Sequence, residues 1–282
     1  MRISFSTGIY YHLPLRYSLG LAHELGYDGV EWVVHPGYVL RGLEPVRRAF
    51  AESGVRALSV HPPFYRMPGW PRRWDRATER TGALARYVGA ELFVVHAALL
   101  HSLESPRASQ YVSALARGSL ASGPGIVIGV ETGQHTKRRL YLLDDLPTLV
   151  AFCQEHHCGI TFDTCHAGAN GEDLLESYAI VKPVMRNVHL SDVVWKRGHP
   201  HTHRLPGEGD LPLAAFLQQL ARDGYDGIVT VESHPRLTGP LSRAEATRRL
   251  GQALDFVRAH TASQVRSGAA NSTSGEPIPA EE

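Results

Sequence analysis

Acidic and histidine side chains recur at the ends of short apolar runs along this chain. His96 follows residues 93–95 (Phe-Val-Val), and Glu131 follows residues 128–130 (Ile-Gly-Val). Side chains of this kind are found at Glu31, His61, His96, Glu131, Asp163, His189 and Glu232. Each has a structural explanation when taken singly, since a histidine in such a place usually makes a hydrogen bond and a glutamate usually meets an arginine or a helix N-terminus. Gathered in one cavity, they would repel one another or be costly to desolvate without cations, so the pattern predicts a metal centre.

More histidines follow in the segment 199–210. His201 and His203 are separated by one residue, and in an extended segment both rings point to the same side. Imidazole nitrogens are common zinc ligands, so we expect both residues as additional ligands, with a solvated polar loop as the alternative. Gly207 and Gly209 would let this loop fold closely over a ligand.

The elements that must bring these side chains together alternate along the chain. Each β-branched run is followed by a longer stretch with apolar residues at helical spacing, such as Phe216, Leu217 and Leu220. The predicted strands are residues 3–7, 29–33, 57–61, 92–96, 126–131, 160–163, 187–190 and 228–232. Eight such units in about 260 residues match an α/β fold, a single parallel (β/α)8 TIM barrel. The C-terminal ends of all eight strands meet on one face of that fold, where the metal centre is expected.

Length and composition define the domain organisation. We expect the barrel in residues 1–260 and a disordered C-terminal tail in 261–282, which is rich in Ser, Gly, Ala, Pro and Glu. The chain of 282 residues carries 29 basic and 28 acidic side chains, so its overall charge does not indicate a polyanionic partner. Three cysteines are too few for a disulfide framework or a four-cysteine zinc site, whereas sixteen histidines are ample for metal binding.

The location of the protein is also suggested by the sequence. The chain does not open on a basic segment followed by an apolar stretch, as a secretion signal would. No apolar run approaches the length of a membrane span. We therefore expect a cytoplasmic protein with free thiols and no membrane partner, and the sequence does not indicate its oligomeric state.

Three motifs carry a family resemblance. They are residues 163–166 (Asp-Thr-Cys-His), residues 187–192 (Asn-Val-His-Leu-Ser-Asp), and His203 followed by residues 205–209 (Leu-Pro-Gly-Glu-Gly). Residues 1 to about 258 resemble the xylose isomerase-like TIM barrel superfamily, which includes sugar and sugar-phosphate isomerases and epimerases as well as zinc phosphodiesterases of the endonuclease IV type. The resemblance implies four shared metal ligands, which are Glu131, Asp163, His189 and Glu232.

The isomerase and epimerase branch implies one divalent ion, Mn, Mg or Co, that chelates the carbonyl and adjacent hydroxyl of the substrate. Glu131 and Glu232 would lie on opposite sides of the substrate and move a proton at the carbon next to the carbonyl, while the ion stabilises the enediolate. His166 resembles the residue that contacts the substrate oxygen. The catalytic residues implied by this branch are therefore Glu131, Glu232 and His166.

The endonuclease IV branch implies two or three zinc ions and additional ligands. By resemblance it would add His61, His96, His166 and an Asp-x-His pair in the loop after the seventh strand. This chain has those three histidines and His203, but His201 stands where that branch has Asp. Imidazole also ligates zinc, so a polynuclear site stays an alternative, although the lost negative charge weakens the case for a third ion.

Two observations point in opposite directions. The number of histidines favours the hydrolase, since a one-ion isomerase does not need His61, His96 or His203. A duplex-binding enzyme would show a basic footprint around the barrel mouth, whereas arginines such as Arg72 and Arg73 are scattered among acidic residues.

We therefore expect a metal-dependent isomerase or epimerase of a sugar, sugar phosphate or related polyol. The alternative is hydrolysis of a phosphoester, in DNA or in a small molecule. Two roles stay open in the sequence. Glu31 is either a hydrogen-bond partner of a ligand or an ion-pair residue, and the segment with Trp70 and Trp74 either forms a wall against the substrate or packs its own loop.

Overall fold

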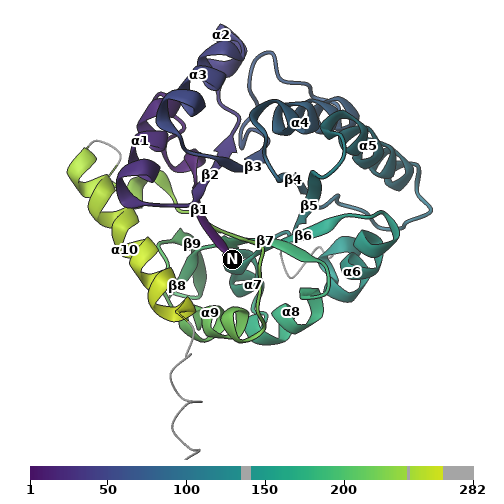
Figure 1. Cartoon of the computed structure of the whole chain (residues 1–282). Helices are drawn as coiled ribbons and strands as arrows, with labels where there is room; N and C mark the ends of the chain where they lie inside the picture. Colours follow the sequence, from purple (N-terminus) through teal and green to yellow (C-terminus); the bar gives the residue numbers. More distant parts are fainter. Residues whose placement is uncertain (135–140, 240–241, 263–282) are drawn as a thin grey trace, which may run out of the picture.

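Eight parallel strands close into a barrel in the computed structural model, which confirms the predicted (β/α)8 fold (Figure 1). The structure describes residues 1–134, 141–239 and 242–262. The barrel strands are β1 (Arg2–Ser6), β2 (Gly29–Val33), β3 (Ala57–His61), β4 (Leu92–His96), β5 (Val127–Glu131), β6 (Gly159–Asp163), β7 (Met185–Leu190) and β10 (Ile228–Val231). Neighbours around the barrel follow chain order, and β1 closes the ring by pairing with both β2 and β10.

Helices connect the strands and form a ring around the barrel (Figure 1). The α-helices of the described residues are α1 (Leu15–Leu25), α2 (Pro36–Arg41), α3 (Glu44–Ser53), α4 (Trp74–Val88), α5 (Pro106–Ser122), α6 (Leu146–Glu155), α7 (Thr164–Asn170), α8 (Leu174–Val181), α9 (Leu213–Arg222) and α10 (Arg243–Thr261). Short 3-10 helices are η1 (Thr7–Tyr10), η2 (Leu142–Asp144) and η3 (Pro235–Leu237).

The burial of strands and helices follows from this architecture. β2, β3 and β6 are buried at every residue, because one face of each strand fills the barrel and the other packs beneath the helices. α9 buries Phe216, Leu217 and Leu220, the residues whose helical spacing predicted it. The boundaries of β2, β3 and β4 are those predicted, and the other barrel strands differ by one or two residues, as at β7, which begins at Met185 instead of Asn187.

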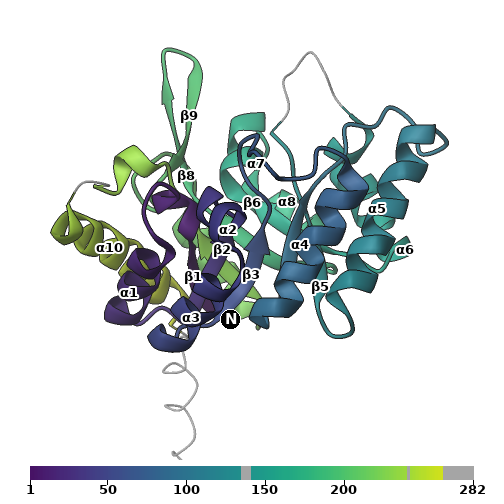
Figure 2. The ribbon, with the colours of Figure 1, turned by 90° about the horizontal axis from the view of Figure 1, so that it is seen from above.

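An antiparallel hairpin stands where the sequence predicted only an extended loop. It consists of β8 (Asp192–Lys196) and β9 (His199–Arg204), and Figure 2 shows it projecting beyond the barrel at the end opposite the N-terminus. Arg197 and Gly198 connect the two strands, and both have a positive φ, of 51° and 76°. Two successive residues with positive φ form the turn type that matches the twist of paired strands, which is why the chain reverses here.

The last helix of the barrel domain is α10, which ends at Thr261. The disordered tail predicted for residues 261–282 falls, from residue 263 onward, outside the described residues. None of the helices in the described part of the chain combines the length and apolar character needed to cross a bilayer.

α4 and α5 approach each other closely through two glycines. A Cβ on Gly82 would meet the carbonyl oxygen of Gly118 well inside van der Waals contact, and a Cβ on Gly118 would lie 2.7 Å from Cγ2 of Thr78. Because the obstacle at Gly82 is backbone, it cannot move aside without displacing a helix. The close packing of α4 against α5, the helices that follow β3 and β4, therefore depends on glycine at both positions.

Gly82→Ala is expected to destabilise the protein by about 1–3 kcal/mol, because the added methyl group must push α4 away from α5. Urea unfolding monitored by circular dichroism measures the change. Gly20→Ala is the matched control, since Gly20 lies within α1 and its Cβ would meet only the flexible end of Arg243 at 3.4 Å. That variant should be unchanged or stabilised by up to about 1 kcal/mol, and an equal loss in both variants would contradict the packing argument.

Candidate metal centre

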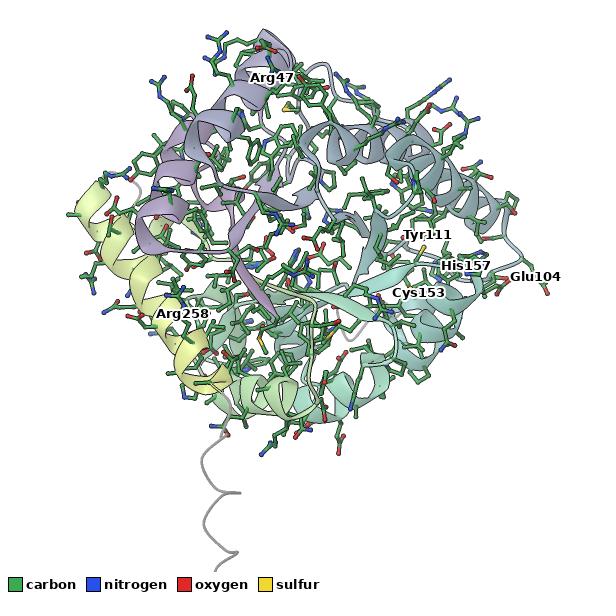
Figure 3. The ribbon with its side chains drawn as sticks, in the orientation of Figure 1. Arg47, Glu104, Tyr111, Cys153, His157 and Arg258 are labelled. Carbon is green, nitrogen blue, oxygen red and sulfur yellow. The ribbon has the colours of Figure 1, made fainter. Side chains whose placement is uncertain are left out.

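Four buried side chains meet inside the barrel at the C-terminal ends of its strands. They are Glu131, the last residue of β5, Asp163, the last residue of β6, His189 in β7 and Glu232 directly after β10. One ligand atom from each lies within 4.8 Å of the others. Side chains with nitrogen and oxygen atoms fill this interior in the view of Figure 3. The structure thus brings together the four ligands implied by the resemblance.

His189 lies at the centre of the group. Its Nδ1 is 3.0 Å from Oε1 of Glu131 and 2.9 Å from Oε2 of Glu232. Its Nε2 is 3.1 Å from Oε2 of Glu31. Burial lowers the pKa of the imidazole, but three surrounding carboxylates outweigh burial and hold the pKa of His189 well above its usual value.

The carboxylates of the group are suited to a cation. Burial raises the pKa of Glu131 and of Glu232, but the adjacent His189 outweighs burial, and both pKa values lie below the usual range. Within the described residues, Oε2 of Glu131, Oδ2 of Asp163 and Oε2 of Glu232 are buried and form no hydrogen bond, although each lies within 3.4 Å of an imidazole nitrogen. Buried carboxylate oxygens without a hydrogen bond suit a divalent ion, so the residues present fit such an ion.

A second group of ligand atoms shares Glu131. Nε2 of His96 lies 3.2 Å and Nε2 of His61 lies 3.6 Å from Oε2 of Glu131. Nδ1 of His61 is 2.6 Å from the carbonyl oxygen of Pro62, which turns its other nitrogen toward Glu131. Tyr111, labelled in Figure 3, donates its hydroxyl to the carbonyl oxygen of His96 at 2.9 Å and so fixes the end of β4.

The third group lies beside Asp163 and contains a residue that sequence reasoning missed. Oδ1 of Asp163 accepts the N–H groups of Cys165 and His166 at 2.8 and 3.0 Å, which caps α7. Sγ of the buried Cys165 lies 3.6 Å from Nδ1 of His203, and Cys165, His166 and His203 form a group of three close ligand atoms. The motif 163–166 contained the signal, since a cysteine in the first turn of a helix that begins at the site must lie near it.

His201 is not part of any of the three groups that the described residues form. It is exposed on β9, where it pairs with Val194 of β8. The side chains of His201 and His203 were expected to share one side of an extended segment. His203 has a φ of 55°, which interrupts the strand alternation on which that expectation depends.

Asp192, the last residue of the motif 187–192, organises the loop after the hairpin. Its Oδ1 accepts the N–H groups of Val193 and Leu211 at 2.9 and 3.0 Å, and its Oδ2 accepts those of Gly207 and Gly209 at 3.1 and 3.0 Å. A Cβ on Gly209 would collide with this carboxylate, which explains the glycine there. Asp192 therefore closes the loop 205–211 onto the base of the hairpin that carries His203.

A cavity of about 240 Å³ borders the four-ligand group. It is lined by Gly8, Ile9, Tyr11, Phe64, Tyr65, His203, Glu232, Ser233, His234 and Pro235. The rings of Tyr11 and Tyr65 are 5.6 Å apart, so one wall of the cavity is aromatic. Its described lining contains neither lysine nor arginine.

Trp70 and Trp74 lie elsewhere. The guanidinium of Arg80 is 5.3 Å from the ring of Trp70, and Trp74 packs edge-on against Tyr111 with the guanidinium of Arg107 at 5.0 Å. Neither tryptophan lines the cavity beside Glu232. Trp70 packs against Arg80 of α4, which favours the packing interpretation for this residue. Trp74, the first residue of α4, instead lines a second cavity, of about 150 Å³, together with His96 and Tyr111.

The fold and the buried ligand groups define a class of protein, a TIM barrel with a metal centre expected at the C-terminal ends of its strands. Sequence comparison gives the family. Residues 19–260 match the family described as xylose isomerase-like TIM barrel, and the chain belongs to it.

Two relatives represent what the sequence is similar to. An uncharacterized protein of Mycobacterium tuberculosis is 27% identical over 283 residues, which cover 92% of this chain and 98% of that protein. Fructoselysine 3-epimerase of Escherichia coli O157:H7 is 22% identical over 258 residues, which cover 82% of this chain and 90% of that enzyme.

Solved structures show the same fold. The 3-keto-D-glucoside 4-epimerase of E. coli is 20% identical, with a TM-score of 0.68, covering 92% of this chain and 99% of that one. The D-allulose 3-epimerase of Methylomonas sp., in complex with D-allulose, is 17% identical, with a TM-score of 0.68 and coverage of 92% and 97%. At these identities the likeness establishes the shared barrel.

Asp192→Asn is expected to loosen the loop 205–211, because an amide offers one acceptor oxygen where the carboxylate offers two. The amide NH2 group of asparagine would face two of the four backbone N–H groups, which would lose their acceptor, at a cost of about 1.5–3 kcal/mol. Hydrogen exchange should speed up at Val193, Gly207, Gly209 and Leu211. Asp210→Asn is the control, since the side chain of exposed Asp210 accepts one N–H group among the described residues, that of Trp195. Equal exchange in both variants would contradict the role of Asp192.

Proposed function

We propose that this protein is a divalent-metal-dependent isomerase or epimerase that moves a proton on a carbon next to the carbonyl of a sugar or related polyol. The observation that carries the proposal is the pair of buried carboxylates Glu131 and Glu232, both within 3.0 Å of one imidazole and both with lowered pKa values. The names of the similar enzymes, which include sugar epimerases, support the same reaction class.

The four-ligand group of Glu131, Asp163, His189 and Glu232 would hold the ion. A divalent ion there would supply the Lewis acidity that makes the hydrogen next to a carbonyl easier to remove. The two glutamates come from β5 and β10, with β6 and β7 between them, so they approach a bound molecule from different sides. One carboxylate removes the proton, and a proton returned by the other to the opposite face of that carbon inverts its configuration.

We propose that His166 orients a substrate oxygen. Its Nδ1 lies 2.8 Å from the carbonyl oxygen of Thr132, which is the geometry of an N–H donated to that carbonyl. The other ring nitrogen is then left for a substrate hydroxyl or carbonyl oxygen. This arrangement supports a contact between His166 and a substrate oxygen that positions the substrate, while Glu131 and Glu232 transfer the proton.

The cavity beside Glu232 favours a neutral substrate over a phosphorylated one. An aromatic wall suits the apolar face of a sugar, and the hydroxyls of Tyr11, Tyr65 and Ser233 can exchange hydrogen bonds with its hydroxyl groups. Phosphate recognition usually relies on arginine, lysine or a helix N-terminus. The described lining of this cavity contains neither arginine nor lysine.

Hydrolysis of a phosphoester is the second candidate. The two further groups, His61, His96 and Glu131 on one side and Cys165, His166 and His203 on the other, support it, since clustered ions activate water in such hydrolases. Glu131 belongs to two groups and could bridge neighbouring ions. The number of ions bound therefore separates the two functions.

Glu131→Gln should slow the exchange of a ketose C–H with solvent by about 10²- to 10⁴-fold, because an amide cannot accept the proton. Proton NMR of a panel of free ketohexoses in D₂O, with Mn²⁺, Mg²⁺ or Co²⁺ added, measures the exchange. Glu44→Gln, on the exposed surface of α3, should exchange at the wild-type rate. Wild-type exchange in Glu131→Gln would remove its assigned role.

Metal analysis of protein purified without chelators should find about one ion per chain, Mn, Mg or Co, because the proposed reaction needs only the four-ligand group. Inductively coupled plasma mass spectrometry gives the count and the element. Two or more tightly bound zinc ions would reject the isomerase in favour of the hydrolase. Turnover that persists after complete removal of metal would reject both functions.

A further inference from the structure

Glu31 is a buried carboxylate that the proposed reaction does not use. It lies in β2 and is fully buried inside the barrel. His189, which it contacts, belongs to β7, and around the barrel β1 and β10 stand between these two strands. The contact therefore spans the interior of the barrel instead of following the hydrogen bonds between neighbouring strands.

One oxygen of Glu31 serves two partners. Oε2 lies 3.1 Å from Nε2 of His189 and accepts the hydroxyl of Ser59 at 2.9 Å. Ser59 is the residue of β3 that pairs in register with Glu31, so the hydroxyl is fixed by the sheet itself. Among the described residues, the ion-pair partner of Glu31 is His189, so the two roles left open by the sequence, hydrogen-bond partner of a ligand and ion-pair residue, coincide in this contact.

The two nitrogens of His189 face different surroundings. The described partner of Nε2 is Glu31, whereas Nδ1 lies 3.0 Å from Glu131 and 2.9 Å from Glu232, two members of the four-ligand group. A neutral imidazole carries one N–H and one lone pair, and the partner of one nitrogen decides which nitrogen keeps the proton. With a cation held by the four-ligand group, the proton of Nδ1 is displaced, and the carboxylate at Nε2 keeps the other proton there, so that the lone pair of Nδ1 is directed at the cation.

We propose that Glu31 is a positioning residue, which holds the Nε2–H of His189 so that Nδ1 presents its lone pair to the metal ion, and that Ser59 holds Glu31 in turn. The inference rests on the proposed metal centre. Carboxylates that orient a ligating histidine in this way typically contribute 10- to 100-fold to metal affinity. Glu31 itself is in none of the three ligand groups that the described residues form.

The first test is metal affinity, measured by competition for Co²⁺ with a chelator of known affinity and followed by the visible absorption of bound Co²⁺. Glu31→Gln keeps the shape of the side chain and should bind Co²⁺ about 10- to 100-fold more weakly than the wild type. Ser59→Ala should show a smaller loss in the same direction. Ser4→Ala is the matched control, since it removes another buried hydroxyl of the barrel, bonded to Thr230 at 2.9 Å, and should leave the affinity unchanged.

The second test observes the proton directly. In ¹⁵N-labelled wild-type protein loaded with Zn²⁺, the ring of His189 should carry its proton on Nε2, with a signal shifted downfield by the carboxylate, and that signal should move upfield or broaden in Glu31→Gln. The peak is assigned by its loss in His189→Asn. A purely structural role for Glu31 would not move it.

These outcomes distinguish failure of the metal centre from failure of the role proposed for Glu31. A wild-type chain that binds neither Co²⁺ nor Zn²⁺ would reject the metal centre, and the role of Glu31 with it. Wild-type binding with equal affinity in Glu31→Gln, or a Zn²⁺-loaded His189 with its proton on Nδ1, would reject only the role of Glu31.

Discussion

The charge balance around His189 is the interaction on which the rest of the site depends. One imidazole, fully buried in β7, lies within 3.1 Å of carboxylate oxygens from three different strands or strand ends. Such a concentration of buried carboxylates is stable only with positive charge among them, supplied by the imidazolium or by a bound cation. The closed barrel makes the arrangement feasible, because it holds β2, β5 and β10 around β7 at fixed distances.

Local structure and metal ligation are combined in the same side chains. One oxygen of Asp163 caps α7, while the other is buried without a hydrogen bond among the described residues and is left for a cation. Asp192 uses both oxygens on backbone N–H groups and so belongs to the scaffold, although it stands three residues from His189 in the same motif. Whether an aspartate at a strand end can serve as a ligand thus depends on how many backbone donors it already satisfies.

The three ligand groups explain why one barrel suits two chemistries. The four-ligand group offers four ligand atoms and borders a cavity whose described lining contains no lysine or arginine, an arrangement that favours proton transfer on a neutral molecule. His61 and His96 add donors on one side of Glu131, and Cys165 and His203 add donors beside Asp163. A sulfur ligand in that last group distinguishes it from the oxygen-rich centre, since thiolate favours zinc over magnesium or manganese.

Much of the fold was predictable from sequence, because its signals are local. Apolar runs separated by helical spacing gave eight strand-helix units, and in a parallel barrel the last residues of all strands meet on one face, which brings Glu131, Asp163, His189 and Glu232 together. The tertiary structure alone decided what depends on backbone angles and on contacts across the barrel. The positive φ of His203 interrupts the alternation that linked it to His201, and the fold of α7 carries Cys165 to His203. Glu31 reaches His189 only because the barrel closes, and a contact between residues 158 positions apart leaves no periodic trace in the sequence.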